Sequence, residues 1–433
     1  MVELAERRNS SWILCAIALG AALAVLRAAP AAAAVHHSKH KAAAHGKRHQ
    51  SQSNAPAYKG ALLEDAESGK VLYEFNSDMQ WPPASMAKMM LLLVASDQIR
   101  AGRVKLDDPV RVSERSGHTG GSRVGLLEGQ VYPLGELMKA ALIKSANDAA
   151  VAVAEKIGGS VEATVLMMNE RARSLGMAHT EYHTVDGLPP RPAHDADFTN
   201  ARDLATVARA IIRNTSLLQW SSQEEADFDG GICMLHNTNH LVGHFYGCDG
   251  LKTGFTSQAG FNLTATAKRG NMRLIAVVLG AASNQQRFAQ AAKLLDWGFD
   301  RYTAVSLLRS GEPLPVQVQV ESGPLIQPVA QRDLIVVLPK DNVAGLKVEY
   351  EVPPRIAGPV KTGEELGRVV AHDHGGVLNE ISAVSPIAVG QPVEQGQYGS
   401  DSWDGQRQPS AQYGGDAWSA IRPPAVVPVQ ENQ

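Results

Sequence analysis

Two serine-lysine pairs with a spacing of three could support nucleophilic catalysis. The pattern Ser-x-x-Lys occurs at residues 38–41 and again at residues 85–88. The first pair lies in a His- and Lys-rich stretch that has too few apolar residues to hold a fixed geometry. The second pair begins the most apolar run of the chain, and its spacing places both side chains on one face of a helix. Because a neighbouring base activates a serine hydroxyl, Ser85 is the candidate nucleophile and Lys88 its base.

Lys88 can act as a base only when its amine is neutral. The ordinary pKa of lysine is about 10.4, so the pKa of Lys88 would have to fall to about 7. A change of this size corresponds to a free energy of about 4 kcal/mol. Burial and nearby positive charge lower a lysine pKa in this way. A helix N-terminus also offers N–H groups and partial positive charge where an oxyanion would form. The sequence therefore predicts a buried Lys88 beside Ser85 at the start of a helix.

The motif Ser145-Ala146-Asn147 is the only Ser-x-Asn in the chain. Taken alone it is typical of a helix cap, because Ser and Asn often supply capping side chains. Together with the serine-lysine pair it indicates additional polar groups for the same site. Both interpretations stay open from the residues alone.

Lys-Thr-Gly occurs twice, at residues 252–254 and 361–363. The second copy follows Pro-rich sequence and precedes two glutamates, which is typical of an exposed turn. The first copy lies just before a strand pattern at residues 261–267. A strand edge can hydrogen-bond an extended peptide, Lys252 and Thr253 can hold a terminal carboxylate, and Gly254 permits close approach. We therefore assign the functional role to Lys252 and not to Lys361.

The elements that must position these motifs alternate between strand and helix patterns. Strands are predicted at 61–65, 71–74, 261–267 and 274–280, and helices from 85 onward, across 134–178 with a break at residues 158–159, at 199–213 and at 287–302. Strands, then helices, then strands predict an α+β domain in which helices pack on an antiparallel sheet. Strand patterns without helical period at 316–320, 334–338 and 348–352 predict a small all-β domain after it.

The predicted organisation has five parts. They are a signal peptide (1–34), a disordered His/Lys-rich tether (35–57), the α+β domain (58–305), the small β domain (312–389) and a disordered tail (390–433). The signal peptide is indicated by the basic residues Arg7 and Arg8, a short apolar core and a run of small residues typical of a cleavage site. We expect an exported protein that is soluble in the periplasm, because the tail has isolated aromatic residues and repeated prolines in place of an amphipathic anchor.

Bulk composition limits the classes of function. The 433 residues are 44% hydrophobic and 20% charged, which is typical of a globular protein and not of a fibrous or disordered one. The net charge of −3 argues against nucleic acid as a partner, since phosphate binding normally needs a basic surplus. Of three cysteines, Cys15 lies in the predicted signal peptide. Cys233 and Cys248 remain, and in an oxidising compartment we expect them to form a disulfide.

The three motifs, taken in this order, are the signature of penicillin-binding proteins and serine β-lactamases. Within that superfamily the sequence resembles the low-molecular-mass D-alanyl-D-alanine carboxypeptidases from about Tyr58 to Tyr302, and more loosely to about Val389. The stretches that carry the resemblance begin at Pro83 (Pro-Ala-Ser-Met-Ala-Lys-Met-Met), Lys144 (Lys-Ser-Ala-Asn-Asp-Ala), Val185 (Val-Asp-Gly-Leu), Ala201 (Ala-Arg-Asp-Leu-Ala), Asp249 (Asp-Gly-Leu-Lys-Thr-Gly), Ala259 (Ala-Gly-Phe-Asn-Leu) and Met272 (Met-Arg-Leu-Ile-Ala-Val-Val-Leu-Gly).

The resemblance implies a role for each motif residue. Ser85 would be the acylated nucleophile and Lys88 its general base, with Ser145 relaying protons. The substrate would be bound by Asn147, Lys252, Thr253, Gly254 and Phe255, and the oxyanion by the backbone N–H groups of Ser85 and Phe255. No metal or other cofactor is implied. The chain departs from the family pattern at Ala146, where glycine is usual, and at Phe255, where His or Tyr is common.

The activity that the resemblance implies is removal of the terminal D-alanine from peptidoglycan stem pentapeptides. This activity would be part of peptidoglycan biosynthesis and of the control of cell shape. β-Lactam antibiotics would be covalent inhibitors. A D,D-endopeptidase that cuts crosslinks is not excluded by the motifs. A β-lactamase is disfavoured because no Glu-x-x-Leu-Asn lies between Asn147 and Lys252. An inactive wall-binding scaffold is disfavoured because a pure binder does not need a nucleophile-base pair.

Overall fold

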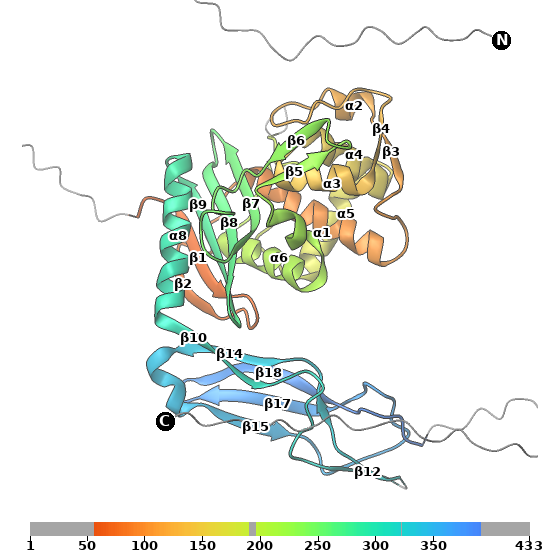
Figure 1. Cartoon of the computed structure of the whole chain (residues 1–433), viewed down its shortest axis with the longest axis vertical. Coiled ribbons are helices and arrows are strands. Elements are labelled where there is room, and N and C mark those ends of the chain that lie inside the picture. The colour runs from red at the N-terminus through yellow and green to blue at the C-terminus, as the bar shows by residue number, and fades with distance from the viewer. Residues whose placement is uncertain (1–55, 190–195, 322, 391–433) are drawn as a thin grey trace, which may run out of the picture. The chain divides into compact units, whose positions relative to one another are not determined.

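The structure is a computed structural model that describes residues 56–189, 196–321 and 323–390 (Figure 1). The predicted signal peptide, nearly all of the predicted tether and nearly all of the predicted tail lie outside the described residues. The serine-lysine pair at residues 38–41 also lies outside them. All three motifs that carry the functional prediction lie within them.

A five-stranded antiparallel sheet forms the centre of the N-terminal region, with the strand order β2-β1-β9-β8-β7. Its strands are β1 (Gly60–Asp65), β2 (Val71–Phe75), β7 (Cys248–Thr256), β8 (Gly260–Arg269) and β9 (Met272–Ala281). Because β1 and β2 come from one end of this region and β7 to β9 from the other, the chain must return to the sheet after its helices. The lysine-threonine-glycine strand β7 is at an edge, with one side of its backbone not paired within the sheet.

Both faces of the sheet are buried, which explains the continuous apolar run of β9. Leu274, Ala276 and Val278 pack in one cluster with residues of α8 (Asn284–Arg301). The alternate residues Ile275, Val277 and Leu279 pack in a second cluster with α1 (Lys88–Arg100). Since successive side chains of a strand point to opposite faces, a strand covered on both sides is apolar throughout. Figure 1 shows α8 along one face of the sheet and α1 and α6 on the other.

The remaining helices and two small hairpins cover the α1 side. They are η1, a 3₁₀ turn (Ala84–Ala87), α2 (Glu114–Gly117), α3 (Leu134–Ile143), α4 (Asn147–Gly158), α5 (Val161–Ser174), α6 (Ala201–Asn214), α7 (Leu217–Ser221), the hairpin of β3 (Pro109–Arg111) and β4 (Val131–Pro133), and the hairpin of β5 (Glu225–Phe228) and β6 (Cys233–His236). Residues Met89 to Ala95 of α1 are all buried, as its all-round apolar sequence predicts.

The C-terminal region consists of strands. They are β10 (Tyr302–Leu308), β11 (Val318–Val320), β12 (Leu325–Ile326), β13 (Val329–Ala330), β14 (Leu334–Pro339), β15 (Lys347–Glu351), β16 (Arg355–Ile356), β17 (Glu365–Asp373) and β18 (Gly376–Val384), with the 3₁₀ helix η2 (Lys340–Gly345). The longest sheet here has the order β13-β18-β17-β15. Leu334, Val336 and Leu338 occupy alternate positions of β14, and their side chains pack in one apolar core. The predicted α+β class is confirmed.

Local capping chemistry accounts for several element boundaries. Helix α8 begins three residues before the predicted start at Arg287 because the Ser283 side chain caps it by accepting from the N–H of Gln286. Gly159, with φ +79°, ends α4 at the predicted break. The predicted strand at 316–320 is shorter than expected, since only β11 (Val318–Val320) pairs there.

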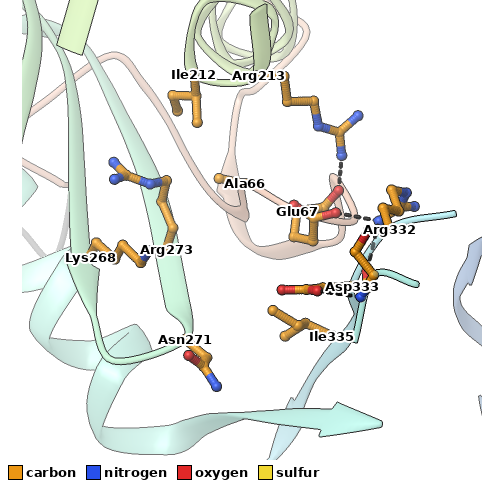
Figure 2. A pocket seen from close by; sticks show the side chains of 11 residues that line it. Ala66, Glu67, Ile212, Arg213, Lys268, Asn271, Arg273, Arg332, Asp333 and Ile335 are labelled. Atoms are coloured by element: carbon orange, nitrogen blue, oxygen red, sulfur yellow. Dashed lines mark hydrogen bonds and ion pairs between the residues drawn. The ribbon is translucent and has the colours of Figure 1, made fainter. Parts of the chain in front are cut away.

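Figure 2 shows the side chains that line a cavity of about 650 Å³, and no residue of the three motifs is among them. Its charged side chains mostly contact protein partners. Glu67 pairs with Arg332 and accepts from Arg213 through its carbonyl, and Arg273 pairs with Asp249 at 2.7 Å. These partners satisfy several of the charges around the cavity, and no motif residue lines it.

Candidate active site

Ser85 and Lys88 are in direct contact. Lys88 Nζ donates a hydrogen bond of 3.0 Å to Ser85 Oγ. Ser85 lies in the 3₁₀ turn η1 and Lys88 is the first residue of α1, so the expectation that both belong to one α-helix is wrong. A 3₁₀ turn has three residues per turn, and a spacing of three therefore still aligns the two side chains.

Lys88 is completely buried, and each of its three N–H bonds has an acceptor. Besides Ser85, its Nζ donates to Asn147 Oδ1 at 2.6 Å and to the carbonyl of Asp186 at 2.7 Å. Burial lowers the pKa of Lys88 from 10.5 to about 8, although the carboxylates of Asp186, Asp197 and Asp148 act in the opposite direction. At neutral pH roughly a tenth of such an amine is uncharged, which is enough for a general base.

The serine and asparagine of Ser-x-Asn face the site and do not cap a helix. The N-cap of α4 is Ala146, with no capping bond from its side chain. Ser145 is buried and has the left-handed φ of +62°, which is uncommon outside glycine. Asn147 donates from Nδ2 to the carbonyl of Gly120 at 2.8 Å while its Oδ1 accepts from Lys88. The amide of Asn147 is thereby fixed in orientation.

Lys252 brings a second buried amine to the same site. Its Nζ donates to Ser145 Oγ at 2.8 Å and to the carbonyl of Thr253 at 3.1 Å. The pKa of Lys252 is lowered, first by burial and then by the charges of Lys88 and Arg287. An anion placed beside Lys252 would relieve this repulsion and favour its charged form. The local electrostatics therefore favour binding of a carboxylate.

Gly254 explains how β7 approaches the nucleophile. A Cβ atom at this position would lie 2.6 Å from the carbonyl oxygen of Pro83, so any side chain would push β7 away from η1. The backbones of Ser85 and Phe255 therefore belong to two segments in close contact. The Phe255 ring is 53% exposed, with its centroid 4.3 Å from that of Phe261.

The structure brings the predicted residues into two linked groups on facing segments. Ser85, Lys88 and Asn147 form one group, and Ser145 and Lys252 form the other. The second lysine-threonine-glycine copy is different, because Lys361 is exposed in a turn where its backbone N–H donates to Glu364 at 2.7 Å. The prediction that this copy is an exposed turn is confirmed.

Comparison with known proteins agrees with this geometry. Residues 47–283 match the family model described as D-alanyl-D-alanine carboxypeptidase. The chain belongs to the D-alanyl-D-alanine carboxypeptidase family. As a member it is a serine-type peptidase, and the resemblance inferred from its motifs is confirmed.

Relatives cover most of the chain. It is 34% identical over 343 residues to the D-alanyl-D-alanine carboxypeptidase DacF of Bacillus subtilis, covering 78% of this chain and 86% of that protein. It is 33% identical to DacC of Escherichia coli, over 79% of this chain and 86% of that protein. Among solved structures it is similar to penicillin binding protein 5 of Haemophilus influenzae, with a TM-score of 0.66, 29% identity and coverage of 78% and 99%.

The predicted disulfide is wrong, because Cys233 and Cys248 are both free thiols. Cys233 lies in the β5–β6 hairpin, where its Sγ is 3.7 Å from the carbonyl of Met234. Cys248 begins β7, and its Sγ donates to the carbonyl of Gly250 at 3.5 Å. Burial raises the pKa of Cys248 to about 11, so this thiol stays protonated. An even number of cysteines says nothing about whether their Cβ atoms are close enough to bond.

Two residues behind the site were not singled out by sequence reasoning. Arg287 is 7% exposed and donates from Nη1 to the carbonyls of Gly254 at 3.1 Å and Asn262 at 3.2 Å. Burial lowers the pKa of Arg287 to about 10. It adds positive charge behind the lysine-threonine-glycine strand. Its position 35 residues after Lys252 carries no local pattern that would reveal this role.

Asp148 is the second such residue, and it anchors the segment that contacts Asn147. Its carboxylate accepts from the backbone N–H groups of Val124, Gly125 and Leu126 at 2.8 to 3.2 Å. The same segment supplies the Gly120 carbonyl that holds the Asn147 amide. Asp148 follows Asn147 directly, so its place beside the Ser-x-Asn motif is a local signal in the sequence.

Gly187 lies against η1, and its substitution tests whether the position of this turn matters for the reaction of Ser85. It has φ +80°, and a Cβ atom there would lie 1.9 Å from the carbonyl oxygen of Ala84. Gly187→Ala must therefore shift the turn that carries Ser85, and a displacement of about 1 Å costs roughly 100-fold in rate. We expect acylation by penicillin to slow by about that factor, measured by stopped-flow kinetics.

Gly102→Ala is the matched control for this prediction. Gly102 has a similar φ of +70° but no atom within 4 Å of an added Cβ. Both variants carry the conformational cost of about 1–2 kcal/mol for a left-handed residue. We expect only Gly187→Ala to slow acylation. Equal acylation rates in the two variants would contradict the role given to this contact.

Proposed function

We propose that this protein removes the terminal D-alanine from peptidoglycan stem pentapeptides through an acyl-enzyme on Ser85. The observation that carries the proposal is Lys88, a buried amine with lowered pKa that contacts Ser85 and Asn147. The facing Lys252 is a second buried amine, which contacts Ser145, and a peptide carboxylate placed beside it would favour its charged form. Family membership supports the same chemistry.

In the acylation step, neutral Lys88 accepts the proton of Ser85 as Oγ attacks the carbonyl carbon of the penultimate D-alanine. The negative charge on the carbonyl oxygen is stabilised by the N–H groups of Ser85 and Phe255. The intermediate then collapses, the carbon–nitrogen bond breaks, and the leaving D-alanine amine takes the proton that Lys88 accepted from Ser85, which returns Lys88 to its neutral form. Ser145 is suited to relay that proton because it contacts Lys252.

In the second half of the reaction, water attacks the ester carbonyl and returns the Ser85 hydroxyl. Asn147 is suited to hold the substrate amide, since its own amide is fixed by Lys88 and Gly120. Before acylation, while the terminal D-alanine is still attached, Lys252 and Thr253 hold its carboxylate. Gly254 keeps β7 close enough for an extended peptide to align along it.

A β-lactam offers the same reactive groups, a strained amide and a carboxylate, so we propose β-lactams as covalent inhibitors. This proposal is supported by the similarity to penicillin-binding protein D2 of Listeria monocytogenes, which was solved in an ampicillin-bound form. That match has a TM-score of 0.53 and 28% identity, over 57% of this chain and 99% of that one.

We also propose that the protein is exported to the periplasm, where peptidoglycan is found. The support is the predicted signal peptide, whose basic, apolar and small-residue segments follow in the usual order. Across the described part of the chain, no helix combines the length and apolar character needed to cross a membrane.

The proposed reaction is tested by mass spectrometry of products from a purified pentapeptide muropeptide. We expect one product peptide shorter by a single alanine, together with free D-alanine. Conversion of a crosslinked muropeptide dimer to monomers, without loss of terminal alanine, would identify an endopeptidase. Rapid hydrolysis of penicillin with no action on either muropeptide would identify a β-lactamase.

The pH dependence of acylation follows from Lys88. The neutral amine is the active form, and its fraction rises as pH increases toward the pKa of about 8. We expect kcat/KM for D-alanine release to rise about tenfold per pH unit between about pH 6 and 7.5, and to level off above pH 8. Melting temperatures measured at each pH provide the control for stability. A rate that falls over this range would show that Lys88 must be charged to act.

A further inference from the structure

A segment of three residues, Asn237 to Asn239, connects the two sides of the site. The Asn237 side chain donates to the carbonyls of Ser221 at 2.9 Å and Gln223 at 2.8 Å. The buried Asn239 side chain donates to the carbonyl of Gly250 at 2.8 Å, in β7 two residues before Lys252. Both ends of this segment are thus fixed by asparagine side chains.

Thr238, in the middle of the segment, contacts both α3 and the strand β7. Its backbone N–H donates to the carbonyl of Ile143, the last residue of α3, at 3.1 Å. Its Oγ1 accepts a hydrogen bond of 2.8 Å from Thr253 Oγ1. Within the described residues, the Thr238 hydroxyl donates to no other side chain or carbonyl. Its proton is therefore available for a new partner.

We propose that Thr238 is a positioning residue that directs the Thr253 hydroxyl toward the terminal carboxylate of the substrate. Without substrate, Thr253 donates to Thr238. When a carboxylate arrives, Thr253 turns its proton to it, and Thr238 then donates to Thr253. Only two protons rotate, because a hydroxyl both donates and accepts. Each bond in such a chain strengthens the next. This proposal rests on the carboxypeptidase function proposed above.

The test compares two peptides that differ only at the C-terminus. One ends in D-Ala-D-Ala with a free carboxylate and the other ends in the corresponding amide. For each enzyme variant, kcat/KM is measured for both peptides and their ratio gives the preference for the carboxylate. Thr238→Val keeps the shape and the backbone hydrogen bond but removes the hydroxyl. Thr238→Ser keeps the hydroxyl and serves as the rescue variant.

We expect Thr238→Val to lower the acid-to-amide preference about tenfold, mainly through KM for the acid, because the hydrogen bond that orients the Thr253 hydroxyl is lost. Thr238→Ser should retain the wild-type preference. A general loss of structure would lower kcat/KM for both peptides by the same factor and would reduce the melting temperature. An unchanged or increased preference in Thr238→Val would overturn the proposal. Absence of D-alanine release by the wild-type enzyme would instead refute the carboxypeptidase function.

Discussion

Ser85→Ala is expected to abolish both D-alanine release and covalent labelling by fluorescent penicillin, while the protein stays folded. The nucleophilic oxygen is absent, and loss of a catalytic nucleophile lowers kcat by roughly 10⁴-fold or more. The fold should tolerate the change because Lys88 keeps its acceptors on Asn147 and Asp186. Release is measured by a D-amino acid oxidase assay, and folding by circular dichroism.

Ser96→Ala is the matched control for this prediction. Ser96 lies on α1, the helix that begins at Lys88, and its Oγ donates to the carbonyl of Leu92 within its own helix. Labelling and release should equal those of the wild-type protein. Stoichiometric labelling that persists in Ser85→Ala would remove Ser85 from the role of nucleophile.

Lys252→Ala is expected to lower kcat/KM by about 10² to 10³-fold, whereas Lys361→Ala should change it by no more than about twofold. Truncating one partner of a buried charge pair costs about 2–5 kcal/mol, and in the proposed function the buried Lys252 is the partner of the substrate carboxylate. Lys361 is an exposed residue in a turn, where substitutions are usually worth less than about 0.5 kcal/mol. Both lysines belong to a Lys-Thr-Gly motif, so a difference between the two variants must come from their places in the fold and not from the motif itself.

Lys252→Met guards against a defect in folding. It removes the charge while keeping most of the volume, and burial already disfavours the charged form of Lys252. We expect its melting temperature to match the wild-type value and its kcat/KM to fall as in Lys252→Ala. Similar losses from the Lys252 and Lys361 substitutions would show that the functional copy of the motif was chosen wrongly.

The motifs of the candidate site could be recognised in the sequence because their spacing is local and their neighbours follow strand and helix patterns. Ser85 and Lys88 are three residues apart, and the apolar run behind them fixes a buried helix. The first lysine-threonine-glycine copy was distinguished by the apolar strand that follows it, now β8. Such signals lie within a few residues of each motif, which is why the sequence carries them.

Other features depend on contacts between distant segments and could not be read from the sequence. The third acceptor of Lys88 is the carbonyl of Asp186, 98 residues away, and any residue type could supply it. Thr238 and Arg287 likewise contact partners on other elements. The disulfide prediction failed for the same reason, because pairing depends on the separation of Cys233 and Cys248 in space.

The most direct test of the central claim is to identify the residue that a penicillin acylates. The purified protein is incubated with the antibiotic, denatured and digested, and the peptides are mapped by tandem mass spectrometry. Our account predicts one adduct per chain, with the added mass on Ser85. An adduct on another residue, or D-alanine release from stem peptides by a protein that forms no adduct at Ser85, would contradict it.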